Sequence, residues 1–528
     1  MRIQSKQYAE WVALQASRTA ADPLYTGEHL KDVVEKVNLS PNRQLRATSY
    51  RSQGVTPFAH LYNIDAGLGK LKQFTNASDF EDECERHPRG VWHNAGLLFL
   101  TGHATPGWLN AIGGEFHIDP LHLVELLGDR TTLRLSTFAF PSIPSASTTV
   151  IYLAIPTIGH VEPRKPRISS TDMQRLRGRC TESLRQLART LHSTVAPGAA
   201  VLKRFYLHDP NTFTIEQDIT VSIVHNGSRW TVLISCDCSG DGECPDPPLR
   251  SRKGYERSQF MLTPVVQLKR GRQPSDNGGN VRRTTLNLPQ SLAMLPGNYG
   301  QMLDCQLAAQ DPFCALYELM NFAASAEAQW VNMIEQHLNE QVELTGHDRY
   351  DAPSRADFQH ESEILESRIA RLKRLLGILD NRDKLDWPQC DNADLQIGAK
   401  GYIAELKKDF NYLLNQLLLL LKKSERGKDA VMGNTNTVIA QRALLHNQTL
   451  GRLTSMGTWV AMLYVLLSFL TTIFGMNFRE FNSGHLSIWI WATTSTAVLL
   501  MCLATFLYWR RNWLLGQLYV IKSWLVLR

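Results

Sequence analysis

Residues suited to hold a hydrated cation stand at the end of a long uncharged segment. The tripeptide Gly475-Met476-Asn477 closes a run between Arg452 and Arg479 that contains no charged side chain. A divalent cation such as Mg²⁺ gives up its water reluctantly, so a selective site holds the hydrated ion with oxygen dipoles. Asn477 offers an amide carbonyl, and Gly475 permits close approach of neighbouring backbones. The tripeptide therefore predicts a site for a hydrated cation.

A row of small and hydroxylated residues precedes this tripeptide at helical spacing. Going back from Asn477, the row contains Thr472, Ser468, Val465, Ala461, Thr458 and Thr454. Intervals of three and four residues place them on one face of a helix. Hydroxyl oxygens on such a face suit a hydrated cation. Small and hydroxylated residues also mediate helix packing in lipid, so both interpretations stay open.

Two apolar segments near the C-terminus are long enough to cross a bilayer. They are residues 456–477 and 486–508, separated by a short external loop at 478–485. About 20 apolar residues in a helix span a hydrocarbon core of roughly 30 Å. We therefore expect a membrane hairpin rather than two buried helices of a soluble protein. Basic residues flank it on both sides, namely Lys422, Lys423 and Arg452 before it and Arg510, Arg511, Lys522 and Arg528 after it. This bias predicts that both termini face the cytoplasm.

Length and composition limit the remaining choices. A chain of 528 residues is expected to form two or more folding units. Its 56 basic and 50 acidic residues are spread along the chain, so the charge distribution gives no reason to expect a nucleic-acid partner. The nine cysteines are unevenly spaced and odd in number, and with both termini facing the cytoplasm they are expected to be reduced thiols. The N-terminus lacks the apolar core of a secretory signal. The plasma membrane is the default expectation, with the mitochondrial inner membrane or another organelle left open.

The expected elements change from mixed to helical along the chain. We predict an α+β cytoplasmic domain at 1–300, a helical stalk at 301–455, the hairpin, and a basic cytoplasmic tail at 509–528. The expected strands are 90–102, Thr131–Phe138, Thr148–Ile155, Val201–Leu207, Phe213–Val224, Trp230–Cys236 and Phe260–Leu268. The expected helices of the first domain begin near Ser78, lie on both sides of Asp119-Pro120, and cover Thr171–Ser193.

The stalk carries apolar residues at the heptad rhythm that is typical of coiled coils. One row contains Leu365, Ile369, Leu372, Leu376 and Leu379, and the next contains Ile403, Leu406, Phe410, Leu413, Leu417 and Leu420. These rows need partners, either within the chain or between subunits. No proline occurs from Tyr402 to Asn477. A single helix with a flexible point at Gly433-Asn434 is therefore expected to enter the membrane.

The position of Gly-Met-Asn, between the first of two C-terminal spans and a short loop, resembles the CorA superfamily of magnesium channels. Residues 97–127, LLFLTGHATPGWLNAIGGEFHIDPLHLVELL, also resemble the N-terminal domain of its fungal-type members. The resemblance implies a funnel-shaped homopentamer that conducts Mg²⁺, with no enzymatic chemistry and no cofactor. It places the pore lining at Asn477, Thr472, Ser468 and Val465. Mg²⁺ is then the transported ion and a candidate regulatory ion.

The loop after the motif departs from that family. Arg479 stands where an acid is common, and Glu480 is the acid that remains. A ring of arginines would repel cations at close range unless Glu480 neutralises it. Two alternatives therefore accompany the channel: a non-conducting membrane signalling or scaffold protein, and a transporter of Zn²⁺ with the same fold.

Three other clusters have weaker chemical interpretations. The acidic run from Asp79 to Glu85 fits a divalent-ion sensor or, more simply, a solvated helix face. Cys236, Cys238 and Cys244 lie in a segment expected to be a loop, and they lack the fourth ligand of a structural zinc site. The segment from His360 to Glu363 is expected on a solvated helix face, with no catalytic constellation.

Overall fold

The computed structural model describes most of the chain in two compact units, Met1–Met432 and Gly433–Arg528. The described residues are 5–21, 33–34, 37, 57–64, 71–86, 95–118, 122–123, 126, 150–162, 165–194, 197–226, 229–239, 248–251, 260–267, 291–345, 352–385, 387–390, 392–474 and 487–526. Unit 1 is an α+β domain, and unit 2 contains the two apolar C-terminal helical segments.

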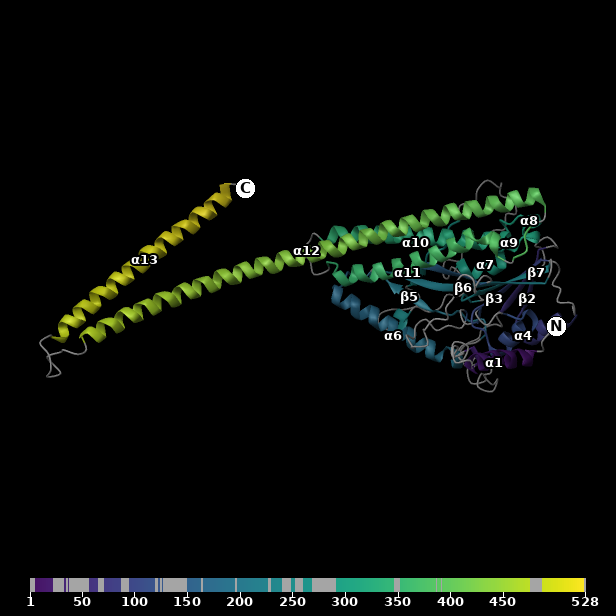
Figure 1. Ribbon diagram of the computed structural model, residues 1–528, viewed down its shortest axis with the longest axis horizontal. Helices are drawn as coiled ribbons and strands as arrows, with labels where there is room; N and C mark the ends of the chain where they lie inside the picture. Colours follow the sequence, from purple (N-terminus) through teal and green to yellow (C-terminus); the bar gives the residue numbers. More distant parts are fainter. Residues whose placement is uncertain are drawn as a thin grey trace. The chain divides into compact units, whose positions relative to one another are not determined.

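Unit 1 is built on one curled eight-stranded sheet (Figure 1). The strand order is β2-β1-β3-β7-β6-β4-β8, and β5 pairs with β6. The strands are β1 Ala59–Asn63, β2 Leu71–Phe74, β3 Ala95–Thr101, β4 Val150–Val161, β5 Arg204–Leu207, β6 Thr212–Asn226, β7 Arg229–Cys236 and β8 Phe260–Leu262. Strands β3 and β7 are parallel, whereas the other described pairs are antiparallel.

Helices cover both faces of this sheet (Figure 1). The first half of the chain supplies α1 Ser5–Ala21, α3 Ala77–Arg86, α4 Pro106–Phe116 and α6 Ser170–Thr194. The second half supplies α7 Ser291–Asn298, α8 Cys305–Gln310, α9 Pro312–Ala315, α10 Tyr317–Leu344, α11 Arg355–Asp380, α12 Ala393–Phe474 and α13 Ile488–Val526. Short 3₁₀ turns lie at Pro248–Ser251 and Arg382–Lys384.

Strand β3 is buried on both faces, which explains its continuous apolar sequence. Leu97 and Phe99 belong to the core that α10, α11 and α12 cover, and Leu98 and Leu100 belong to the core beneath α1, α3 and α4. A third cluster joins α6 to β5 and β6. The sheet is therefore the middle layer of three.

Both heptad rows of the stalk are buried within the chain. All the apolar positions named for the two rows contribute to the large core cluster on the sheet. The sequence left partners within the chain and between subunits open, and the structure shows partners within the chain.

Helix α11 begins with a capping box in which Ser354 and Asp357 bond each other's backbone N–H groups. Helix α9 begins after Asp311, whose carboxylate accepts from the N–H groups of Phe313 and Cys314.

Most of the expected strands and helices of the first domain are confirmed. The strand near Ala95 and the four between Thr148 and Cys236 are present, as are the helices near Ser78, Pro106 and Ser170. The sequence did not predict α1, β1 or β2, and β8 is shorter than expected. The expected strand Thr131–Phe138 and the turn at Asp119-Pro120 lie outside the described residues.

Helix α12 is continuous over 82 residues, as the absence of proline predicts. The boundary between the two units falls at Met432 and Gly433, the place where the sequence predicted a flexible point.

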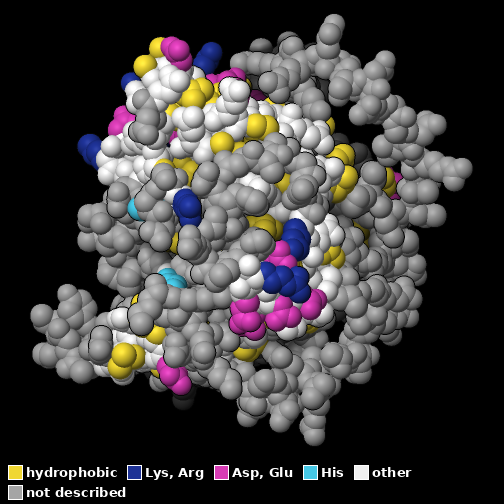
Figure 2. All heavy atoms as spheres, turned by 90° about the vertical axis from the view of Figure 1, so that its right-hand side faces the viewer, with side chains coloured by type: hydrophobic (Ala, Val, Ile, Leu, Met, Phe, Trp, Pro, Cys, Tyr) yellow, Lys and Arg dark blue, Asp and Glu magenta, His cyan; other side chains and the backbone are white. Residues whose placement is uncertain are grey.

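On the face of the molecule in Figure 2, acidic and basic side chains of the described residues lie close together.

Candidate functional site

Two described helical segments are long and apolar enough to cross a membrane. One is the C-terminal part of α12, and the other is Ile488–Thr505 in α13. Within the single chain, the residues of their apolar stretches are exposed or half-buried, and almost none is buried. This exposure is what a lipid or protein environment around these helices would cover. The motif Gly475-Met476-Asn477, with Arg479 and Glu480, lies outside the described residues.

The expected row of small and hydroxylated residues lies on α12. Thr472, Ser468, Val465, Thr458 and Thr454 are all helical and exposed. The hydroxyl of Thr472 donates to the carbonyl of Ser468 over 2.7 Å, and the hydroxyl of Thr458 donates to the carbonyl of Thr454 over 2.8 Å. Because each proton is used within the helix, the oxygen lone pairs remain available to water around a cation.

Helix geometry keeps this row together over the width of a membrane. At 3.6 residues per turn, the row from Thr454 to Thr472 stays within about 80° of arc and extends roughly 27 Å. Bulky apolar residues, including Trp459, Leu463 and Leu466, fall on the opposite side of the helix. This division suits a helix with one face toward lipid and one toward a polar path or a neighbouring helix.

A cluster of buried charges in unit 1 joins the sheet to α11. Glu216 of β6 is fully buried. The Arg371 guanidinium donates to both of its carboxylate oxygens, over 2.9 and 2.8 Å. Arg368 approaches Glu216 within 2.7 Å, and Arg204 of β5 pairs with it as well. Burial alone would raise the pKa of Glu216, but the three guanidinium groups hold this pKa well below its usual range. Glu216 is therefore a carboxylate in the folded protein.

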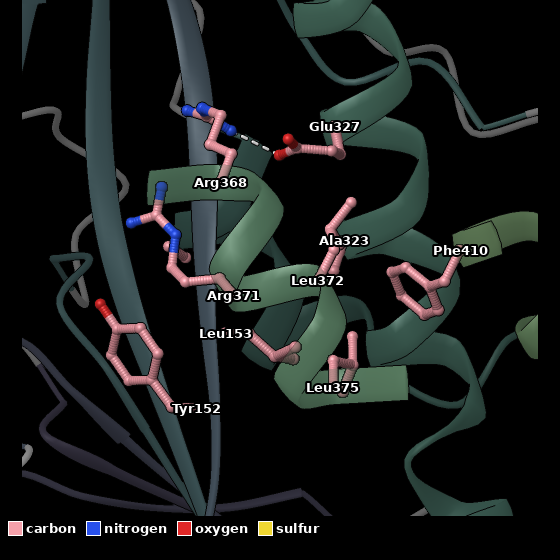
Figure 3. A pocket seen from close by; sticks show the side chains of 10 residues that line it. Tyr152, Leu153, Ala323, Glu327, Arg368, Arg371, Leu372, Leu375 and Phe410 are labelled. Atoms are coloured by element: carbon pink, nitrogen blue, oxygen red, sulfur yellow. Dashed lines mark hydrogen bonds and ion pairs between the residues drawn. The ribbon is translucent and has the colours of Figure 1, made fainter. Parts of the chain in front are cut away.

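Beside this cluster lies a small cavity of about 30 Å³ (Figure 3). Its lining residues come from four elements: Tyr152, Leu153 and Ala154 of β4, Ala323 and Glu327 of α10, Arg368, Arg371, Leu372 and Leu375 of α11, and Phe410 of α12. Arg368 donates to Glu327, as the dashed line in Figure 3 marks. Burial raises the pKa of Glu327, although Arg368 and Arg371 oppose that effect.

A second buried pair connects β5 and β6 with α11. Nδ1 of His208 lies 3.0 Å from Oε1 of Glu361, and both side chains are completely buried. Nε2 of His208 lies 2.8 Å from the Thr214 hydroxyl, which also accepts from Nε1 of Trp330 over 3.2 Å. These contacts fit an imidazole that donates from Nδ1 to Glu361 and meets the Thr214 hydroxyl at Nε2.

The expectation of a solvated face from His360 to Glu363 is therefore wrong for its central residues. Glu361 and Ser362 are buried, and Ser362 lies 3.0 Å from Ser424 of α12 through their hydroxyl oxygens. Burial lowers the pKa of His360 to about 4. The sequence alone suggests a solvent face here because the partners His208 and Ser424 are distant along the chain.

The other two clusters show no arrangement for a metal ion in the part of the chain that the structure describes. Asp79, Asp82 and Glu85 are exposed on α3, whereas Glu83 is buried and pairs with Lys72. Cys236 ends β7, and both Cys236 and Cys238 are buried in the large core, so the start of that segment is not a surface loop. Cys244 lies outside the described residues. Within the described ranges, no three His, Cys, Asp or Glu side chains are placed to hold a metal ion.

Comparison with known protein families finds no match for this chain, and comparison with curated proteins finds no matching relative.

Proposed function

We propose that the protein is a channel or transporter for divalent metal cations of the CorA type, with Mg²⁺ as the transported ion. The row from Thr454 to Thr472 supports this proposal most, because it provides oxygen atoms along one face of an uncharged apolar helix. The row ends five residues before Asn477, where Gly475-Met476-Asn477 follows in the sequence. The order of an α+β domain, a long helix and two apolar helical segments is compatible with this architecture.

In this proposal, several copies of the chain surround one axis, because a single hairpin cannot enclose a path for ions. The resemblance to the CorA superfamily suggests five copies. A hydrated ion moves down its gradient past a ring of Asn477 amides at the outer mouth. It then passes Thr472, Ser468 and Val465. Unit 1 and α12 gate the path, with Mg²⁺ as a candidate regulatory ion.

The experiment that tests this proposal is Mg²⁺ flux into liposomes that contain the purified full-length chain. We expect flux with the wild-type protein and its loss with Asn477→Ala, while the oligomer remains intact by size-exclusion chromatography. Asn482→Ala is the matched control, because it removes another amide from the same loop. Equal flux through the Asn477 and Asn482 variants would reject Asn477 as part of the path.

Two alternatives are tested by the same preparation. Arg479 beside the motif favours a non-conducting signalling or scaffold protein, because a ring of arginines repels cations. That protein would form folded oligomers without Mg²⁺ flux, in the wild type as in Asn477→Ala. A Zn²⁺ transporter of the same fold would carry Zn²⁺ in preference to Mg²⁺. Flux of Mg²⁺, Zn²⁺, Co²⁺ and Ni²⁺ measured singly and in competition identifies the transported ion.

A further inference from the structure

Helix α13 continues well past its uncharged part. It covers 39 residues, Ile488–Val526, which correspond to about 58 Å at 1.5 Å per residue (Figure 1). No Asp, Glu, Lys or Arg stands between Glu480 and Arg510, and Arg511 follows directly. Since about 20 helical residues cross a hydrocarbon core of roughly 30 Å, the uncharged part is long enough by itself. Residues 512–526, the C-terminal extension, therefore continue the helix by about 22 Å beyond it.

The sequence gives the C-terminal extension an apolar side and a mixed side. At 100° per residue, six large apolar residues fall within about 140° of arc. They are Trp513, Leu514, Leu518, Ile521, Trp524 and Leu525, and Gln517 is the polar residue among them. The opposite side carries the other polar residues, Asn512, Gly516, Lys522 and Ser523, together with Leu515, Tyr519 and Val526. Tryptophan and leucine on one side and lysine on the other are typical of helices that lie in a membrane interface. Fifteen residues are too few for a further span.

The charges around the extension have a single sign. No Asp or Glu follows Glu480, whereas Arg510, Arg511, Lys522 and Arg528 do. The side chain of Arg511 is exposed. Near a membrane surface, anionic lipids attract each Lys or Arg by about fivefold in affinity. A segment without acids meets no opposing repulsion from those lipids, so this end of the chain suits an anionic surface.

We propose that the C-terminal extension lies on the membrane surface and binds anionic phospholipid headgroups through Lys522 and the flanking arginines. Its apolar side enters the boundary between headgroups and acyl chains, where indole rings such as those of Trp513 and Trp524 are favoured. The bilayer is the partner because the extension begins where the uncharged part of the same helix ends. This inference rests on the membrane hairpin of the proposed function, which brings residue 512 to the bilayer.

To lie in the surface, the helix has to bend after Arg511. Gly516 has the lowest helix propensity in the extension, so bending costs least near this residue. The remaining residues, 517–526, then run along the surface as the last turns of α13.

The test measures the accessibility of position 521 in the full-length protein in lipid nanodiscs. Ile521→Cys places a thiol in the middle of the apolar side, and an uncharged polyethylene glycol maleimide alkylates it from water. The tryptic peptide that begins at Asn512 contains none of the nine native cysteines, so mass spectrometry reads this position alone. We expect alkylation in an equal mixture of phosphatidylcholine and phosphatidylglycerol to be slower by more than about tenfold than in phosphatidylcholine.

Two further variants, each combined with Ile521→Cys, test the role of charge. Lys522→Gln should lose about fivefold of the protection by anionic lipid. Arg442→Gln is the matched control, because it removes one exposed positive charge from α12, outside the extension, and should keep the protection. Equal effects of the two variants would overturn the proposal.

The comparison of lipids separates the other locations of the extension. Fast alkylation in both lipids would place the extension in water, and slow alkylation in both would place it against protein. Either result would overturn the proposal. Because no step measures ion flux, these outcomes are independent of whether the protein conducts Mg²⁺.

Discussion

Arg368 lies over the ring of Trp330, with 3.8 Å between its guanidinium carbon and the ring centre. The same guanidinium pairs with Glu216 of the sheet and with Glu327 of α10. Trp330 donates to Thr214 of β6, so both partners are also tied to the same strand. A desolvated cation over an aromatic ring contributes about 2 kcal/mol in addition to its ion pairs. The contact between Arg368 and Trp330, together with these pairs, therefore stabilises the packing of α10 and α11 on β6.

Substitution of Arg368 should destabilise unit 1 strongly. In Arg368→Met the packing volume is largely kept, but Glu327 loses its direct charged partner in a buried site. We expect the free energy of unfolding to fall by about 3–5 kcal/mol, measured by urea denaturation of the full-length protein. Arg374→Met on the exposed side of α11 is the control and should stay within about 0.5 kcal/mol of wild type. Equal effects at both positions would contradict the buried cluster.

The buried pair of His208 and Glu361 gives a second prediction. Glu361→Gln keeps the shape of the side chain but removes its charge, so we expect a loss of about 1–3 kcal/mol at pH 7. Burial opposes ionisation of Glu361, but His208 holds its pKa well below the usual range. The stability contributed by the carboxylate is therefore complete above pH 4.5 and is lost as the pH falls toward that lowered pKa. Glu363→Gln, on the exposed side of α11, should show no such loss.

Buried neutral histidines predict that unit 1 loses stability in mild acid. Burial lowers the pKa values of His60, His122 and His360 to about 4 from 6.5. Below pH 6.5 the unfolded chain takes up protons that the folded chain does not, so the free energy of unfolding falls between pH 6.5 and about 4. Each histidine adds a slope of at most about 1.4 kcal/mol per pH unit. Urea denaturation at pH 7.5, 6.0 and 5.0 measures this slope, and a constant stability would refute the prediction.

Two glycines of α12 should respond oppositely to alanine. A Cβ atom at Gly427 would overlap the ring of Phe358, whereas a Cβ atom at Gly433 would meet nothing within 4 Å. We expect Gly427→Ala to destabilise unit 1 by about 1–3 kcal/mol through overpacking. Gly433→Ala should be neutral or stabilise the helix by up to about 1 kcal/mol. Thermal unfolding of both variants provides the comparison, and similar melting temperatures would argue against close packing at Gly427.

The hydroxylated row on α12 makes a prediction for ion flux. Ser468→Val removes an oxygen from the row, so Mg²⁺ flux into liposomes should fall by about tenfold if loss of one polar contact costs about 1.4 kcal/mol. Thr471→Val removes a hydroxyl about 60° away from Ser468 around the helix, outside the row, and should retain most of the flux. A larger loss at Thr471 than at Ser468 would assign the polar path to a different face.

The predictions from sequence were best where apolar residues repeat over several turns. The row from Leu365 to Leu379 identified both the helix and its buried face, because apolar residues at alternating intervals of four and three fall on one side of a helix and on both sides of a strand. Strands β1 and β2 were missed because they are short and contain polar residues such as His60 and Lys72. Glu216 and Glu361 could not be recognised as buried, since their partners Arg371 and His208 lie more than 150 residues away. Ion pairs of that separation leave no periodic pattern.

The order of the core along the chain has a consequence for biosynthesis. A single apolar cluster contains Tyr62 of β1 and Leu420 of α12. Synthesis must therefore pass residue 420 before this core can close, and a nascent chain that ends earlier exposes the apolar face of the sheet. Exposed apolar surface and unpaired strand edges favour aggregation. When the final piece of the core emerges, the apolar part of the same helix is next to be made, so completion of unit 1 and emergence of the apolar part of α12 become consecutive events of translation.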